Sequence, residues 1–284
     1  MHEFEALRAM PWAWWTIAGL GGLCVGSFLN VVIHRLPKML EAGWRDECAE
    51  LRGETPEPRQ RYNLVVPRSA CPSCKHEIRA HENIPVISWL MLRGKCSNCG
   101  VRISARYPII ELAAALLAVA AAWKFGPTYQ AVAVIGLLLV LLALTVIDID
   151  TQLLPDNLTL PLLWAGLIAN SFGLFVPLTD ALWGAIGGYL VLWLVYWAFK
   201  LVTGKEGMGY GDFKLLAALG AWLGWQMLPV IILLSSIVGA TVGIALIVLR
   251  GRDRNIPIPF GPYLAGAGAL AVFFGKALVT AYLG

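Results

Sequence analysis

The stretch Thr128-Tyr-Gln-Ala-Val-Ala-Val-Ile-Gly-Leu-Leu-Leu-Val-Leu-Leu-Ala-Leu-Thr-Val-Ile-Asp-Ile-Asp150 decides what fold this chain can adopt. No charged residue occurs from Thr128 to Ile147, and a helix needs about 20 apolar residues to cross a bilayer. Similar uncharged stretches lie at 13–33, 158–178 and 181–199. Only 14% of the 284 residues are charged, whereas a soluble domain has about 25%. The composition excludes a soluble enzyme, a disordered chain and a secreted disulfide scaffold, and it indicates an all-α polytopic membrane protein.

The number of spans depends on the long uncharged stretch 215–249. As one helix it would be about 52 Å long, too long for a hydrocarbon core of about 30 Å. We therefore divide it at Gly224–Pro229 into a short helix, 211–225, and a second helix, 229–249. Together with apolar segments at 107–123 and 262–283, the sequence predicts about eight transmembrane helices.

The basic residues predict the orientation of these helices. Most of the 22 Lys and Arg residues lie in the loop 34–108, and a further cluster comprises Arg250, Arg252 and Arg254. In the eight-span arrangement both groups lie on the cytoplasmic side, as the positive-inside tendency requires, and both termini lie outside. Glu3 and Glu5 precede a single Arg8, which does not resemble the basic start of a cleavable signal peptide.

These assignments predict three parts. Residues 1–34 form the first transmembrane helix, residues 35–106 a cytoplasmic loop domain, and residues 107–284 a seven-helix membrane domain. Within the loop, acidic residues gather between Glu41 and Glu57. They form either a solvated, partly helical segment or a docking surface for a basic partner.

Two Cys-x-x-Cys pairs mark the loop as a metal-binding segment: Cys71-Pro-Ser-Cys74 and Cys96-Ser-Asn-Cys99. Each pair can place two sulfurs on one tight turn, and four thiolates suit tetrahedral zinc. A reducing cytoplasm disfavours two disulfides, although a redox or unliganded pair of motifs remains the alternative. We expect a structural zinc site, because so polar a loop has little core of its own.

Acidic residues near apolar spans are costly and are therefore candidates for function. Asp148 and Asp150 point about 200° apart on a helix, so only one of them can face the bundle interior. Asp156 precedes an apolar segment, where an N-cap is the expected role. Glu111 either pairs with Arg106 or faces a site.

Asp212 ends the stretch Gly209-Tyr-Gly-Asp212, whose glycines allow another backbone to approach closely. Asp148 and Asp212 both fall at cytoplasmic ends of predicted spans, so they can converge at one depth. Two carboxylates that share a proton can activate water and protonate a leaving group, as in an aspartic protease. A proton- or cation-coupled transporter, in which buried acids relay charge, is the alternative.

Several longer motifs accompany these residues in chain order. They are Gly26-Ser-Phe-Leu-Asn-Val-Val-Ile-His-Arg-Leu-Pro37, the two cysteine pairs, Arg106-Tyr-Pro-Ile-Ile-Glu111, Asp148-Ile-Asp-Thr-Gln-Leu-Leu-Pro-Asp-Asn-Leu-Thr-Leu-Pro161, Gly209-Tyr-Gly-Asp-Phe-Lys214 and Pro257-Ile-Pro-Phe-Gly-Pro262. Through nearly its whole length the chain resembles the type IV prepilin leader peptidases of type IV pilus and type II secretion systems.

The resemblance implies a multi-pass enzyme of the bacterial inner membrane with its zinc loop and active site on the cytoplasmic side. It would be an aspartic endopeptidase that removes the basic leader from prepilins and pseudopilins. It would then methylate the new N-terminus, usually of phenylalanine, with S-adenosylmethionine. By position, Asp148 and Asp212 match the family's catalytic aspartates. Cys71, Cys74, Cys96 and Cys99 match its zinc set, which is associated mainly with methylation.

The expected partners are therefore prepilins, pseudopilins and membrane lipid, with no nucleic acid. We assign no residues to the methyl donor. A presenilin-like protease shares Gly-x-Gly-Asp but also carries a late Pro-Ala-Leu motif, which this sequence lacks. A transporter would usually show internal repeats, and none is apparent. A non-enzymatic pilus-assembly scaffold would tolerate loss of both aspartates.

Overall fold

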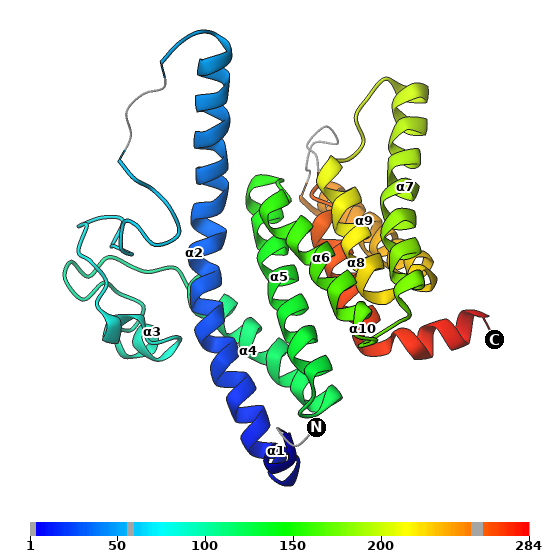
Figure 1. Cartoon of the computed structure of the whole chain (residues 1–284). Coiled ribbons are helices and arrows are strands. Elements are labelled where there is room, and N and C mark those ends of the chain that lie inside the picture. Colours follow the sequence, from blue (N-terminus) through cyan, green and yellow to red (C-terminus); the bar gives the residue numbers. More distant parts are fainter. Residues whose placement is uncertain (1–3, 56–59, 251–257, 284) are drawn as a thin grey trace. The chain divides into compact units, whose positions relative to one another are not determined.

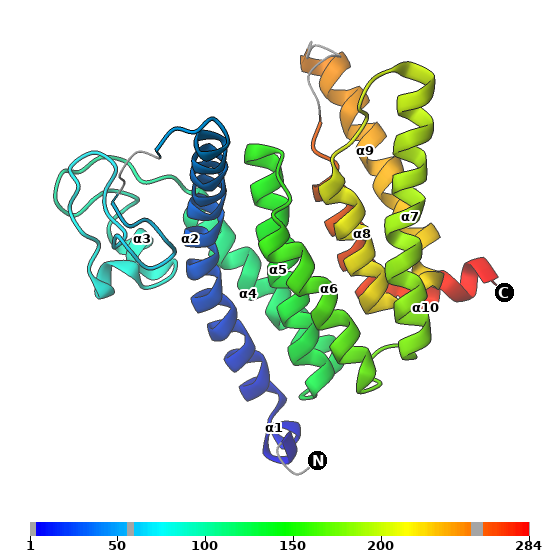
Figure 2. The same ribbon diagram turned by 45° about the horizontal axis from the view of Figure 1, so that its top comes forward.

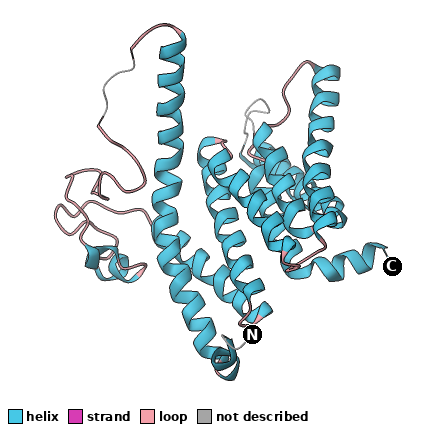
Figure 3. Ribbon diagram, viewed as in Figure 1, coloured by secondary structure: helices cyan, strands magenta, loops and turns pink. Residues whose placement is uncertain are grey.

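The computed structural model describes residues 4–55, 60–250 and 258–283 of the chain (Figure 1). Over these residues it contains helices and no strand, only the isolated bridges Ala70–Glu77 and Lys95–Arg102 (Figure 3). The helices are α1 (Glu5–Ala9), α2 (Pro11–Leu51), α3 (Ile87–Met91), α4 (Arg106–Phe125), α5 (Tyr129–Thr151), α6 (Asp156–Ser171), α7 (Leu178–Thr203), α8 (Tyr210–Leu223), α9 (Leu228–Arg250) and α10 (Gly261–Leu283). The chain forms two compact units, 1–127 and 128–284, and each is described by itself.

Five helices of the described chain are long and apolar enough to cross a membrane: α2, α4, α5, α7 and the stretch 225–249, which includes all of α9 except Arg250. The chain is therefore an all-α membrane protein. Helices α6, α8 and α10 fall on the other three expected segments, but α8 has only 14 residues, or about 21 Å of helix. That all eight segments cross the bilayer stays a prediction, as do the three parts 1–34, 35–106 and 107–284.

Close contact between α2 and α4 organises the first unit. A Cβ at Gly22 would stand 2.8 Å from Cα of Ala115, and one at Gly26 would stand 2.9 Å from Cα of Glu111. Small residues allow this approach of helix backbones in a membrane. Both views show the two helices crossing (Figures 1 and 2).

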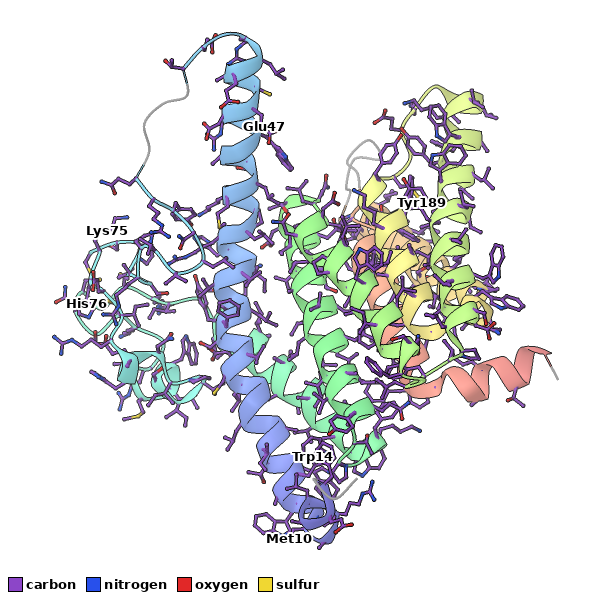
Figure 4. The ribbon with its side chains drawn as sticks, viewed as in Figure 1. Met10, Trp14, Glu47, Lys75, His76 and Tyr189 are labelled. Carbon is purple, nitrogen blue, oxygen red and sulfur yellow. The ribbon has the colours of Figure 1, made fainter. Side chains whose placement is uncertain are left out.

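Helix α2 does not end near residue 34 but continues to Leu51. The acidic residues from Glu41 to Glu50 therefore lie on a helix, and Figure 4 shows Glu47 on this extension. Glu57 lies outside the described residues, as do Arg252, Arg254 and Pro257.

Helix α8 forms the centre of the second unit. Every residue from Asp212 to Leu223 except Lys214 is buried, and α6, α7 and α10 pack against it. A Cβ at Gly188 of α7 would stand 2.6 Å from the carbonyl oxygen of Leu216, so the backbones of α7 and α8 nearly touch. Tyr189, labelled in Figure 4, meets Phe213 of α8 edge-on with ring centroids 5.8 Å apart.

Polar side chains fasten α6 to the end of α8. Trp222 Nε1 donates to the Leu162 carbonyl at 2.8 Å, and Asn170 Nδ2 donates to the Ala221 carbonyl at 2.8 Å. Asn170 is 2% exposed, and its Oδ1 accepts from the backbone N–H groups of Phe175 and Val176. Because a buried amide without partners is costly, these bonds fix how α6 lies on α8.

The predicted break in the stretch 215–249 is confirmed. Helix α8 ends at Leu223, Gly224 takes a left-handed φ of +82°, and a single 3₁₀ turn leads into α9. Pro229 is the second residue of α9, where a missing N–H does no harm.

We predict that Gly188→Ala destabilises the protein, because the new methyl group meets the α8 backbone. Overpacking of this kind costs about 1–3 kcal/mol. Gly136→Ala in α5 is the matched control, since a Cβ there meets nothing within 4 Å. Thermal unfolding in detergent, followed by tryptophan fluorescence, should show a lower Tm only for Gly188→Ala. Equal Tm values would contradict the close α7–α8 contact.

Candidate active site and metal site

Asp148 is an acid buried at the end of an apolar helix. Asp148 lies in the last turn of α5 and is 4% exposed. The helix ends at Thr151, because Gln152 adopts a left-handed conformation. Asp148 Oδ2 accepts a hydrogen bond of 3.0 Å from the backbone N–H of Gly261. Gly261 is the first residue of α10, where backbone N–H groups lack helical partners and favour a negative charge. The N-terminus of α10 therefore holds this carboxylate in place.

Asp212 has a comparable position on α8. It lies in the first turn, is 6% exposed, and receives a hydrogen bond from the backbone N–H of Gly209. Both carboxylates are buried in the second unit, close enough for their charges to interact. Asp212 Oδ1 is buried and has no hydrogen-bond partner among the described residues.

The other two aspartates of the motif lie elsewhere. Asp150 is exposed while Asp148 is buried, as the helical period requires. The expectation that Asp156 is an N-cap is wrong: Pro155 occupies that position, and Asp156 is the first helical residue. Both Asp156 carboxylate oxygens instead accept from Lys214 Nζ, at 2.6 and 2.7 Å. This pair ties the start of α6 to α8, two residues beyond Asp212.

The partners of these acids were not apparent from the sequence. The N–H of Gly261 and the ammonium group of Lys214 are far from Asp148 and Asp156 along the chain. The only local signal is Gly261-Pro262, since proline is favoured in the first turn of a helix.

In the first unit, the four predicted cysteines converge. Their sulfurs all lie within 4.8 Å of one another, with 3.8 Å between the Sγ atoms of Cys71 and Cys99 and 3.9 Å between those of Cys74 and Cys96. Four sulfurs at about 2.3 Å from a tetrahedral ion are about 3.8 Å apart, so the cluster fits such an ion. Neither Cys24 nor Cys48 belongs to it.

The two cysteine turns have the same backbone construction. In the first turn, Cys71 N–H donates to the His76 carbonyl and Lys75 N–H donates to the Cys71 carbonyl. In the second turn, Cys96 N–H donates to the Val101 carbonyl and Gly100 N–H donates to the Cys96 carbonyl. Lys75 and Gly100 both take left-handed φ values, of 61° and 70°. Lys75 and His76 mark the first turn in Figure 4.

Hydrogen bonds to sulfur stabilise the thiolate form of one cysteine in each turn. The backbone N–H of His76 and the side chain of Asn98 lower the pKa of Cys74 to about 6. The backbone N–H groups of Cys99 and Asn98 lower the pKa of Cys96. Because the thiolate is the metal ligand, these bonds favour metal binding.

Glu82 connects the two cysteine turns. It accepts from the Ser97 hydroxyl and the Arg79 N–H, and it lies 3.3 Å from His76 Nε2. These donors lower the pKa of Glu82 to about 2, so it stays ionised. Groups bonded to the segments that carry metal ligands orient those ligands, and Glu82 has this position.

Glu111 anchors the same loop to α4. It is 7% exposed, and its Oε2 accepts from the backbone N–H of Val86 at 2.7 Å, just before α3. Arg35, also buried, donates to the Asn63 carbonyl at 2.9 Å. The motifs around Gly26–Pro37 and Arg106–Glu111 therefore hold the metal loop against the helices of its own unit.

Two family models together match most of the chain: the bacterial peptidase A24 N-terminal domain over residues 20–125, and the type IV leader peptidase family over residues 135–244. A prepilin leader peptidase/N-methyltransferase of Pseudomonas aeruginosa is 60% identical over 284 residues, which cover 100% of this chain and 98% of the relative. The protein of the same name from Aeromonas salmonicida is 57% identical over 98% of this chain and 97% of its own. No solved structure matches.

These matches define a membrane-embedded peptidase. The chain belongs to the type IV leader peptidase family, whose members similar to it carry the name prepilin leader peptidase/N-methyltransferase.

We predict that the purified protein carries a tightly bound metal ion that Cys71→Ser removes, because three sulfurs no longer complete the tetrahedron. Cys48→Ser is the matched control and should keep its metal. Elemental analysis of both variants by mass spectrometry measures this. Equal metal content in the two variants would contradict the four-cysteine site.

Proposed function

We propose that this chain is a bifunctional enzyme of the bacterial inner membrane that cleaves the basic leader from type IV prepilins and pseudopilins and then methylates the new N-terminus. Family membership and two relatives of nearly equal length support both activities. The observation that carries the cleavage step is the pair of buried carboxylates, Asp148 and Asp212, in one unit of an apolar helical bundle.

In the proposed cleavage step, the two carboxylates share one proton. The ionised carboxylate takes a proton from a water molecule, which attacks the scissile carbonyl. The protonated carboxyl group donates to that carbonyl oxygen, and a proton then passes to the leaving amine as the C–N bond breaks. Asp212 Oδ1 has no other hydrogen-bond partner in the described structure, so it is available to the water or the peptide.

The remaining oxygens hold the pair in position. Asp148 Oδ2 is bound by Gly261 N–H, and the Gly209 N–H binds the Asp212 carboxylate. Backbone groups at helix starts are rigid, so they fix the carboxylates without rearranging during the reaction.

The substrate chemistry fits this location. A prepilin has a basic leader followed by a long apolar helix, and that helix can lie among the membrane spans. The scissile bond then lies near the cytoplasmic interface, where Asp148 and Asp212 end and begin their helices. The basic residues Arg250, Arg252 and Arg254 of a short connection, together with those of the loop 34–108, support a cytoplasmic placement of the active site and the cysteine loop.

We further propose zinc as the ion of the cysteine cluster, because four thiolates at tetrahedral spacing are its usual structural site. Cys71, Cys74, Cys96 and Cys99 would hold it, and it would supply fold stability to the loop. S-adenosylmethionine would supply the methyl group. The acceptor would be the new N-terminal amine, and the donor would leave as S-adenosylhomocysteine.

Asp148→Asn and Asp212→Asn should each reduce leader cleavage by about a thousandfold or more, because neither amide can share the proton. Mass spectrometry of a prepilin incubated with each purified variant measures the loss of the leader.

Asp150→Asn is the matched control, since this neighbouring carboxylate is exposed, and its cleavage rate should stay close to that of the unchanged protein. Cleavage retained in Asp148→Asn or Asp212→Asn would show that these two aspartates are not the catalytic pair. A complete loss of cleavage in Asp150→Asn would indicate that Asp150, and not Asp148, is the catalytic residue of this helix end.

Cys71→Ser should impair methylation more than cleavage, because the metal loop and the aspartates belong to different units. The same assay with S-adenosylmethionine separates the products: a cleaved pilin without the added methyl group supports the proposal. Equal loss of both activities would point to a general folding role for the loop.

A further inference from the structure

Leu154 lies in the short connection between α5 and α6. The chain leaves α5 through the left-handed Gln152 and enters α6 through Pro155, so Leu154 belongs to neither helix. Its side chain is nevertheless partly buried and packs against the core of the second unit. A leucine held this way in a connection has a defined contact surface.

That surface is formed by two glycines on different helices. A Cβ at Gly211 of α8 would stand 2.6 Å from Leu154 Cβ and 3.4 Å from its Cδ1. A Cβ at Gly261 of α10 would stand 3.0 Å from Leu154 Cδ2 and 3.1 Å from its Cδ1. Leu154 therefore occupies the space beside both glycines and separates the starts of α8 and α10.

Each of these glycines is part of the backbone that holds one aspartate. Gly211 directly precedes Asp212, and Gly261 donates its N–H to Asp148. A Cβ at Gly261 would also stand 2.7 Å from Asp148 Oδ2. The leucine side chain thus lies against the residue that precedes Asp212 and the residue whose N–H binds Asp148.

We propose that Leu154 is a positioning residue that sets the separation of Asp148 and Asp212 by acting as a spacer between the N-termini of α8 and α10. The inference rests on the proposed function of the two aspartates. Leu154 would then contribute to cleavage without touching the substrate.

The physical reason is the tolerance of a two-carboxylate site. The pair must share a proton and hold one water molecule, and a misplacement of about 1 Å in an active site can cost about a hundredfold in rate. Truncating Leu154 removes the spacer, and the two helix starts can then move toward each other. Because the proposed role of Leu154 is to position the two carboxylates, we expect substrate affinity to change little.

The test is cleavage kinetics of Leu154→Ala on a prepilin in detergent. We expect kcat to fall by about ten- to a hundredfold with KM within about twofold, the pattern of a lost transition-state arrangement. Leu154→Met, which keeps side-chain length and volume, should restore kcat to within about threefold. Leu158→Ala is the matched control, since this leucine has the same partial burial against the same core.

Thermal unfolding of the same preparations in detergent, followed by tryptophan fluorescence, reports whether each variant is folded. If Leu154→Ala does not fold, the cleavage kinetics of Leu154→Val test the proposal in its place. This variant keeps Cβ beside Gly211 but withdraws the Cδ atoms from Gly261, and kcat should fall several-fold with KM unchanged.

Three results would overturn the proposal: unchanged kcat in Leu154→Ala or, if that variant does not fold, in Leu154→Val; an equal loss in Leu158→Ala; or no recovery in Leu154→Met. Asp148→Asn and Asp212→Asn are assayed in parallel. If they still cleave, the proposed catalytic pair is wrong. If they are inactive while Leu154→Ala is normal, only the spacer is wrong.

Discussion

The constraint on which the second unit depends is the burial of two carboxylates in an apolar bundle. Removing an ionised acid from water is costly unless hydrogen-bond donors replace the water. Here the donors are backbone N–H groups at the starts of helices: Gly261 of α10 for Asp148, and Gly209, the residue just before α8, for Asp212. The acids therefore fix where α8 and α10 begin, and the other helices of the unit pack around these two helix starts.

Close backbone contact makes this arrangement possible. Helix α8 is only 14 residues long, yet it is buried along nearly its whole length. Gly188 and Gly220 let α7 approach it, while Trp222 and Asn170 fasten α6 to its other end. A short helix enclosed in this way cannot shift along its axis, so the acid in its first turn is held at a fixed depth.

In the first unit, the main constraint is the stability of a polar loop. Between α2 and α4, the described residues contain one α-helix of five residues and two isolated bridges, so hydrophobic burial contributes little. Four sulfurs at metal-binding distance, Glu82 between the two cysteine turns, and Glu111 bonded to Val86 provide the fixed points. This anchoring explains why Arg35 of the Gly26–Pro37 motif and Glu111 of the Arg106–Glu111 motif are buried.

The sequence by itself determined the helical class, the segments that form the long helices, the break at Gly224 and the convergence of the cysteines. Each of these follows from a local property: apolar length, a glycine, or the spacing within a turn. Only the tertiary structure decided that Asp156 binds Lys214 instead of capping α6, and that Gly261 binds Asp148. These contacts join residues far apart in the chain, and the identity of a residue does not reveal which distant backbone will supply its hydrogen bond.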